Sequence, residues 1–306
     1  MPFVLKKFKA IQGQKIQHFL INEAKLPAPL AQKLLSKNRV FDDRHQPLKN
    51  GQIVDGEFIQ VAVFEGHTRG LKAIFETQDF AVFDKPSGIM VHPTRKDTEY
   101  CLLDEVRYHF GDQASLAHRI DTETSGLVLV GKNKTASRIL KTMFEDRAYT
   151  KEYLAVVKGQ ITNNLTIDKP IAKAHSKISV KMTCEREQGK ASITHIEPIE
   201  FDQQTNTTLV KAIPITGRQH QIRVHLDSIG HAILGDPIYG VSEAIANDYL
   251  CKTLTDKTRL ESCGALRLML HANRLSFTYK ALDYDYVSTQ ATAVFDHFFI
   301  ISKLEL

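Results

Sequence analysis

Several patterns that would mark common protein classes are missing from this chain of 306 residues. No run of eighteen apolar residues occurs, so the sequence predicts no membrane-spanning helix. Glycine motifs of the forms GxGxxG and GxxxxGK are also missing, which argues against the usual nucleotide-cofactor sites. Lysines near the N-terminus precede no long apolar stretch, so we expect no secretory signal.

Cysteine is scarce and scattered. Cys101, Cys184, Cys251 and Cys263 form no CxxC pair, which argues against a structural zinc site and a disulfide framework. We therefore expect reduced thiols and a cytoplasmic location.

The composition is that of an ordinary soluble globular protein, with 42% apolar and 25% charged residues. The net charge of +5 is concentrated near the N-terminus, because residues 1–66 hold ten Lys/Arg against six Asp/Glu, a balance of +4. This segment is either a surface for a polyanion or a merely solvated face.

The chain is predicted to form two domains, residues 1–66 and 71–306. In the first, the pattern indicates helices at 14–24 and 28–37, separated by prolines, and strands at 40–41 and 53–63. In the second, strand-like apolar runs outnumber the helical patterns and do not alternate with them. The predicted strands are 80–83, 127–130, 153–157, 209–215 and 268–277, and the predicted helices are 101–110, 134–146 and 218–229. We expect an α+β fold with a mixed, mainly antiparallel sheet. The polar stretch 241–265 is interpreted as a surface insertion.

The most informative segment is His-Arg-Ile-Asp-Thr-Glu-Thr-Ser-Gly at residues 118–126. It places one carboxylate, Asp121, at a turn between two apolar runs and beside a basic residue. Such a carboxylate is a candidate for nucleophilic chemistry. The alternative is that Asp121 only caps the turn through its side chain.

Three further blocks accompany this one in a fixed order. Lys85-Pro86-Ser87-Gly88 with Val91-His92-Pro93 precedes it, and Lys151-Glu152-Tyr153-Leu154-Ala155 follows. Thr216-Gly217-Arg218-Gln219-His220-Gln221-Ile222-Arg223-Val224-His225 comes next and leads to Gly235-Asp236-Pro237-Ile238-Tyr239-Gly240. Together the blocks resemble the RluA-type RNA pseudouridine synthases over roughly residues 70–280. Tyr279-Lys280 stand where that family usually has His-Pro, so the subfamily and its substrate stay open.

The resemblance implies an enzyme that detaches uracil from its ribose, rotates it and rejoins it through C5, with no metal or cofactor. Asp121 would be the catalytic carboxylate, either as a nucleophile or as a general base on the sugar. An arginine would pair with it; Arg223 is preferred over Arg218. Tyr153 would pack against the target base, and its hydroxyl could transfer a proton at C5.

RNA contacts are assigned to Arg119, Arg218, His220 and Lys151. Arg119 would fill the gap left by an extruded base or contact phosphate. If its segment is a strand, Lys151 is predicted to point away from the face that carries Tyr153. His118 is taken as structural.

A metal reading of His220, His225 and His231 is disfavoured. His220 and His225 are five residues apart, a spacing that does not fit one helix face, and no clustered acid or cysteine completes a set. A metal-dependent hydrolase is therefore a weak alternative.

Residues 1–66 resemble a degenerate S4 RNA-binding module, which favours structured RNA as the partner. Ribosomal RNA is the leading substrate and tRNA the alternative; we expect a monomer with no membrane partner. A non-catalytic RNA-binding or ribosome-assembly factor is the rival function. The presence of Asp121, Tyr153 and Arg223 together argues against it.

Overall fold

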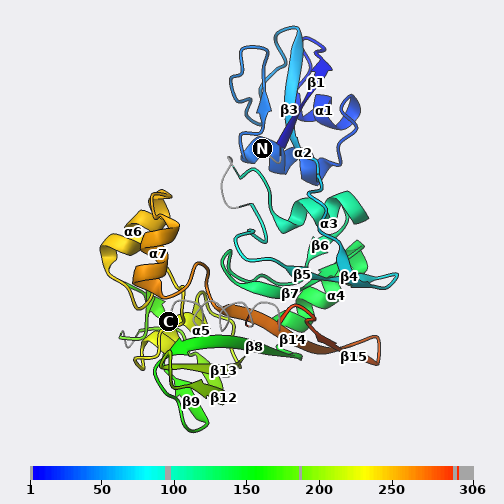
Figure 1. The fold of residues 1–306 in the computed structure, drawn as a ribbon. Helices are drawn as coiled ribbons and strands as arrows, with labels where there is room; N and C mark the ends of the chain where they lie inside the picture. The colour runs from blue at the N-terminus through cyan, green and yellow to red at the C-terminus, as the bar shows by residue number, and fades with distance from the viewer. Residues whose placement is uncertain (1–2, 94–97, 186–187, 292–294, 296–306) are drawn as a thin grey trace. The chain divides into compact units, whose positions relative to one another are not determined.

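A computed structural model describes residues 3–93, 98–185, 188–291 and residue 295 (Figure 1). The chain divides into two compact units. The first combines residues 1–70 with 93–111, and the second combines 71–92 with 112–306. Residues 93–111 thus join the N-terminal unit, although the predicted boundary assigned them to the second domain. No helix in the described ranges is both long and apolar enough to cross a membrane.

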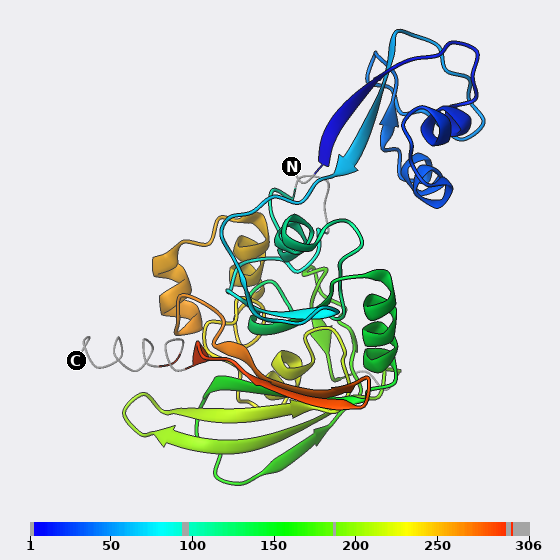
Figure 2. The same ribbon diagram turned by 90° about the vertical axis from the view of Figure 1, so that its right-hand side faces the viewer.

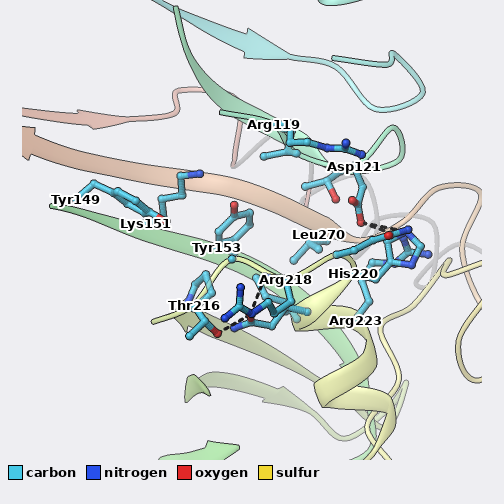
Figure 3. Close-up of a pocket in the computed structure, with 17 residues that line it drawn as sticks. Arg119, Asp121, Tyr149, Lys151, Tyr153, Thr216, Arg218, His220, Arg223 and Leu270 are labelled. Atoms are coloured by element: carbon cyan, nitrogen blue, oxygen red, sulfur yellow. Dashed lines mark hydrogen bonds and ion pairs between the residues drawn. The ribbon is translucent and has the colours of Figure 1, made fainter. Parts of the chain in front are cut away.

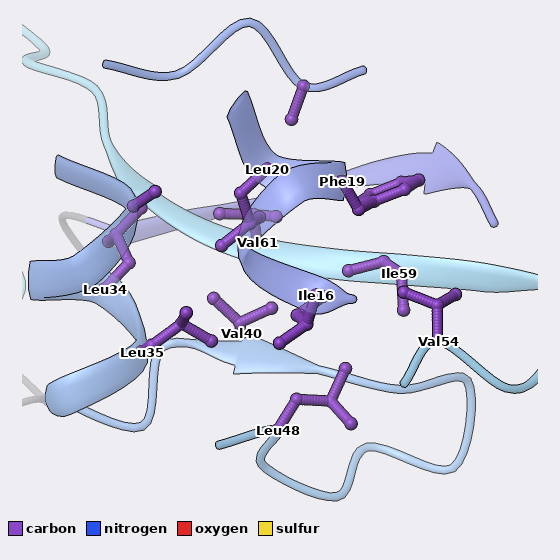
Figure 4. Close-up of a cluster of buried hydrophobic side chains, with 12 residues drawn as sticks. Ile16, Phe19, Leu20, Leu34, Leu35, Val40, Leu48, Val54, Ile59 and Val61 are labelled. Atoms are coloured by element: carbon purple, nitrogen blue, oxygen red, sulfur yellow. The ribbon is translucent and has the colours of Figure 1, made fainter. Parts of the chain in front are cut away.

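The first unit builds a small sheet with helices. Its elements are β1 (Phe3–Lys9), α1 (Ile16–Asn22), α2 (Ala28–Ser36), β2 (Val40–Phe41), β3 (Phe58–Phe64) and α3 (Leu102–Phe110). The strands pair antiparallel in the order β1-β3-β2. Apolar side chains of α1 and α2 pack against this sheet, as Figure 4 shows for Phe19, Leu34 and Val61.

Three of the four predicted elements of this unit are confirmed, and one begins later than expected. Strand β3 begins at Phe58 rather than residue 53, since Gly56 turns the chain with φ +125° just before it. Strand β1 was missed, because most of its side chains are exposed and show no apolar alternation. The likeness to an S4 module stays a prediction.

The second unit is built on a ten-stranded sheet, and its mixed, mainly antiparallel character confirms the predicted fold class. The strand order is β4-β5-β7-β14-β8-β13-β12-β9, with β15 added to β14 and β6 to β7. Only the β7–β14 pair is parallel among the described ladders. The bounds are β4 (Ala73–Glu76), β5 (Phe80–Lys85), β6 (Ser115–Leu116), β7 (Ser125–Gly131), β8 (Tyr149–Lys158), β9 (Leu165–Asp168), β12 (Ile193–Asp202), β13 (Thr207–Pro214), β14 (Leu270–Tyr279) and β15 (Leu282–Val287). A separate short pair joins β10 (Ala172–Lys173) and β11 (Met182–Thr183).

Helix α4 (Lys134–Glu145) covers part of this sheet, as both ribbon views show (Figure 2). Asn133 caps its N-terminus by accepting a hydrogen bond from the Ala136 amide. Its buried face, with Leu140 and Met143, packs on Leu129 and its neighbours.

Helix α5 (Gln221–Asp227) is shorter than the predicted 218–229. His220, directly before the helix, has φ +56° and lies in the left-handed region of backbone space. A residue with this φ cannot be part of a right-handed α-helix. Arg218 and His220 therefore lie on a loop.

The predicted surface insertion at 241–265 is helical. It contains α6 (Glu243–Cys251) and α7 (Asp256–Cys263), which lie next to each other in Figures 1 and 2. Only Ala246 and Cys263 of these helices are buried, so the sequence carries little apolar periodicity to reveal them.

Candidate active site

One cavity of the second unit, of about 300 Å³, gathers residues from three of the four sequence blocks, those that contain Asp121, Tyr153 and Arg223. Its walls are the segment before β7, the start of β8 and the loop that leads into α5 (Figure 3). The seven predicted site residues all line it: Arg119, Asp121, Lys151, Tyr153, Arg218, His220 and Arg223.

Asp121 is held by a buried arginine. The Arg223 Nη1 donates to Asp121 Oδ2 at 3.0 Å, and the Arg223 side chain is 3% exposed. Burial is the largest single influence and would raise the pKa of Asp121. The charge and hydrogen bond of Arg223, with smaller contributions from His220 and Arg119, together outweigh burial and lower the pKa below its ordinary value. Asp121 is therefore an ionised carboxylate at neutral pH, and it remains 23% exposed to the cavity.

Asp236 fixes the arginine itself. Arg223 Nε and Nη2 donate to Asp236 Oδ2 and Oδ1 at 2.7 and 2.9 Å. The same Oδ1 also accepts the amides of Ile238 and Tyr239, so the carboxylate is fully used and its side chain is 0% exposed. This bidentate pair uses Nε and Nη2 and leaves the Nη1 group of the guanidinium to donate to Asp121. The pairing thus runs through Arg223 and not Arg218, whose Nε donates to the Ala191 carbonyl.

Close packing fixes the turn that carries Asp121. Gly126 has φ +110°, and a Cβ there would collide with the backbone of Ala272 on the parallel neighbour β14. The Nζ of the buried Lys85 donates to the Thr122 carbonyl at 3.1 Å. The Ser125 hydroxyl accepts a hydrogen bond from Arg267 at 2.6 Å. These contacts at Thr122, Ser125 and Gly126 anchor the segment that directly follows Asp121.

The helices α6 and α7 reach the same turn. Arg259 of α7 donates to Glu123 Oε2 at 2.7 Å and to the Gly235 carbonyl at 2.9 Å. Tyr249 of α6 donates to Glu123 Oε1 at 3.0 Å. Because Glu123 lies two residues after Asp121, helices α6 and α7 help to hold the site in place through their contacts with Glu123.

Tyr153 and Lys151 lie on the same wall of the cavity (Figure 3). The prediction that Lys151 points away from Tyr153 is wrong, because side chains alternate along a strand and residues two apart share a face. Tyr153 is 8% exposed. Burial and the nearby Tyr149 and Asp121 raise the pKa of its phenol, so the hydroxyl keeps its proton.

His220 joins the acidic side of the cavity. Its Nδ1 lies 3.0 Å from the Tyr239 hydroxyl, and its Nε2 lies 3.9 Å from Asp121 Oδ2. Burial and the charge of Arg223 lower the pKa of His220 to about 4, so the ring is neutral at pH 7. The other two histidines of the segment lie elsewhere: His225 contacts Thr194, and His231 contacts the Lys158 carbonyl.

Comparison with known proteins identifies the family of this chain. The family described as RNA pseudouridylate synthase matches residues 79–228. A Helicobacter pylori protein named "Uncharacterized RNA pseudouridine synthase" is 36% identical over 94% of this chain and 94% of its own length. The chain belongs to the RNA pseudouridine synthase family.

Other relatives of this pseudouridine synthase carry more specific names. A Haemophilus ducreyi protein named "Ribosomal large subunit pseudouridine synthase C" is 32% identical over 87% of this chain and 85% of its own length. A Saccharomyces cerevisiae protein named "tRNA pseudouridine(32) synthase, mitochondrial" is 34% identical over 59% of this chain and 39% of its own length. The solved structure of Human RNA Pseudouridylate Synthase Domain Containing 1 superposes with a TM-score of 0.58 at 25% identity. The superposition covers 79% of this chain and 98% of the human chain.

Sequence reasoning left out several residues that shape the synthase site. Asp236 lies in the Gly235–Gly240 block, but the sequence alone did not indicate that it pairs with Arg223. Lys85 lies in the first of the sequence blocks without an assigned role, and its Nζ donates to the Thr122 carbonyl in the Asp121 turn. Glu123 was part of the main motif, but its partners Tyr249 and Arg259 lie more than a hundred residues away and no local pattern points to them.

The link from α7 to the Asp121 turn leads to a testable expectation. Glu123→Gln keeps the shape of the side chain but removes the charge that Arg259 contacts, so the turn loses a support. Since small displacements of a catalytic group are costly, we expect the single-turnover rate to fall by about 10-fold or more with RNA affinity unchanged. Glu261→Gln, exposed on α7, is the matched control and should behave as wild type. A normal rate for Glu123→Gln, or a loss confined to RNA affinity, would refute this role.

Proposed function

We propose that this enzyme converts specific uridines of structured RNA to pseudouridine, with Asp121 as the catalytic carboxylate and large-subunit ribosomal RNA as its main substrate. The observation that carries the proposal is the ionised, partly exposed Asp121, held by Arg223 beside Tyr153 in a cavity large enough for a nucleobase.

In the proposed reaction, the N1–C1′ bond of uridine breaks and a C5–C1′ bond forms. The C5 proton leaves and N1 gains one, so the product is an isomer and no redox step is needed. Asp121 acts either by attacking a carbon or by removing a sugar proton. Arg223 keeps the carboxylate charged, and the ring of Tyr153 offers a stacking surface for the detached base.

RNA contacts surround this chemistry in the proposal. Arg119, Arg218 and His220 line the cavity as proposed RNA contacts, and no carboxylate is within ion-pair distance of Arg119 or Arg218 in the described part of the chain. Residues 1–66, with a net charge of +4 and a likeness to an S4 module, would hold structured RNA outside the cavity. We propose that the reaction takes place in the cytoplasm. We also propose that the protein acts as a monomer.

Affinity for RNA should depend steeply on salt if basic side chains contact the phosphates. With about six such contacts, raising KCl from 50 to 200 mM should weaken binding by about 10³-fold. The measurement is a titration of a structured ribosomal RNA fragment by filter binding across this range. Affinity that does not respond to salt would contradict the basic-surface account.

A direct competition separates the two substrate classes. Limiting enzyme is incubated with equal amounts of unmodified large-subunit ribosomal RNA and bulk tRNA, and pseudouridine is mapped at nucleotide resolution over time. We expect discrete ribosomal sites to fill first. Earlier modification of tRNA would replace ribosomal RNA by tRNA as the substrate while leaving the reaction intact.

The rival function, a non-catalytic RNA-binding factor, makes a different forecast. It requires RNA binding with no new pseudouridine in either RNA at any enzyme concentration. The same maps therefore decide between the two.

A further inference from the structure

Lys151 occupies an unusual place for a lysine. It lies on the cavity wall next to Tyr153, and its Nζ is 4.7 Å from the ring centre of Phe144 and 5.2 Å from that of Tyr149. Within the described ranges no carboxylate is within ion-pair distance of it. The two rings offer an ammonium some cation–π attraction, but no counter-charge offsets its burial, so the charged form is costly.

The hydrogen bonds of His118 define the state of this amine. The Leu129 amide donates to His118 Nε2 at 3.1 Å, so Nε2 carries a lone pair and no proton. A neutral imidazole must then carry its proton on Nδ1. Nδ1 lies 3.0 Å from Lys151 Nζ. The Nδ1–H faces the lysine nitrogen and also has the Arg119 backbone as a partner. An ammonium at this distance would place donor against donor, so the contact favours the neutral amine.

A protonated His118 does not fit these contacts better than the neutral ring. An imidazolium would turn N–H groups toward both the Leu129 amide and Lys151, and two donors would then face each other at Nε2. Burial also lowers the pKa of His118 well below its ordinary value. The neutral ring with its proton on Nδ1 is the form that satisfies both contacts.

Lys85 shows the opposite arrangement in the same unit. Its Nζ faces three carbonyl oxygens, of Pro86, Ile89 and Thr122, at 2.8–3.1 Å. Three acceptors require the three N–H donors of an ammonium. Burial is common to the two lysines, so the difference lies in what each nitrogen faces.

Building on the proposed function, we propose that Lys151 is the base that removes the C5 proton of uracil after the base has been rejoined through C5. The C5–H bond breaks, its electron pair restores the conjugation of the ring, and the proton moves to the lone pair of Lys151 Nζ. N1 takes a proton from the resulting ammonium, directly or relayed through a water molecule, which returns the amine to its starting state.

The other titratable groups around the cavity suit this step less well. Asp121 is bound to Arg223 and its pKa is lowered, which makes it a weak base. Tyr153 keeps its proton because its pKa is raised, and the pKa of His220 is lowered to about 4. Burial lowers the pKa of Lys151 to about 7, which places it near the optimum for a base at neutral pH.

The test compares RNA carrying deuterium or hydrogen at C5 of uridine in single turnovers. With Lys151→Gln we expect a rate about 10²-fold or more below wild type. We also expect a primary deuterium isotope effect larger than that of wild type, because C5–H cleavage has become slow. We expect the wild-type rate to rise as the pH increases through about 7, because Lys151 must lose its proton to act as a base, and we expect this rise to disappear in the variant. Lys85, whose pKa is also lowered to about 7, is unchanged in both proteins and cannot account for that loss.

Two further variants separate a base from an RNA contact. Lys151→Arg keeps a positive charge that cannot be removed near neutral pH, so it should be as slow as Lys151→Gln. Lys141→Gln, exposed on α4, controls for the loss of one charge and should match wild type. RNA affinity and thermal unfolding are measured for each protein.

The outcomes are distinct. A slow Lys151→Gln without an enlarged isotope effect, or a rate restored by Lys151→Arg, would overturn the base assignment in favour of an RNA contact. If wild type forms pseudouridine and Lys151→Gln does so equally fast, Lys151 is not the base although the proposed function stands. If wild type itself forms none, the proposed function fails first.

Discussion

Replacing Asp121 with asparagine is expected to lower the single-turnover rate of pseudouridine formation by about 10⁴-fold or more, because the amide can neither attack a carbon nor accept a proton. RNA affinity should change little, since Asp121 is an anion and is not assigned to hold phosphate. Stability should also change little, because the side chain is partly exposed and Arg223 keeps its bidentate partner Asp236.

This combination of results is specific. The measurement is a quench-flow or manual time course on a short RNA substrate, with filter binding and thermal unfolding on the same preparations. An activity loss that coincides with loss of folding would not support a catalytic role. Activity near wild type would mean that another residue carries the chemistry.

Replacing Asp236 with asparagine is expected to produce the largest loss of stability. The variant leaves the Arg223 guanidinium, 3% exposed, with an imperfect partner in the interior. Breaking a buried ion pair typically costs about 3–5 kcal/mol in the free energy of unfolding. Because Arg223 also orients Asp121, we expect pseudouridine formation to fall as well. Urea unfolding monitored by circular dichroism measures the first effect.

A matched control exists on the surface of the same sheet. Arg274 donates to both oxygens of Asp285 in the same bidentate geometry, but this pair is exposed. Asp285→Asn should therefore lose much less stability than Asp236→Asn, since exposed ion pairs are screened by water. Equal losses in the two variants would contradict the importance of burial at Arg223.

Much of the site could be predicted from the sequence because its residues lie in compact motifs. Asp121, Tyr153 and Arg223 come from separate blocks, yet each block carried enough family pattern to be assigned. The fold class was also predictable, since the apolar runs of the central strands are long and regular.

The parts that could not be predicted depend on contacts between distant segments. Whether Arg218 or Arg223 pairs with Asp121 is decided by Asp236, which anchors only Arg223. Helices α6 and α7 expose most of their surface, so their sequence has no strong period, and their contact with Glu123 is a tertiary one. Strand β1 was missed for a similar reason, because its exposed side chains do not alternate.

The most direct test of the central claim is a pair of pseudouridine maps at nucleotide resolution. Unmodified ribosomal RNA and bulk tRNA are incubated separately with wild type and with Asp121→Asn at equal RNA-bound fractions. We predict new pseudouridine at discrete sites with wild type only. New sites with both proteins would contradict the claim that Asp121, held by Arg223, is the catalytic carboxylate.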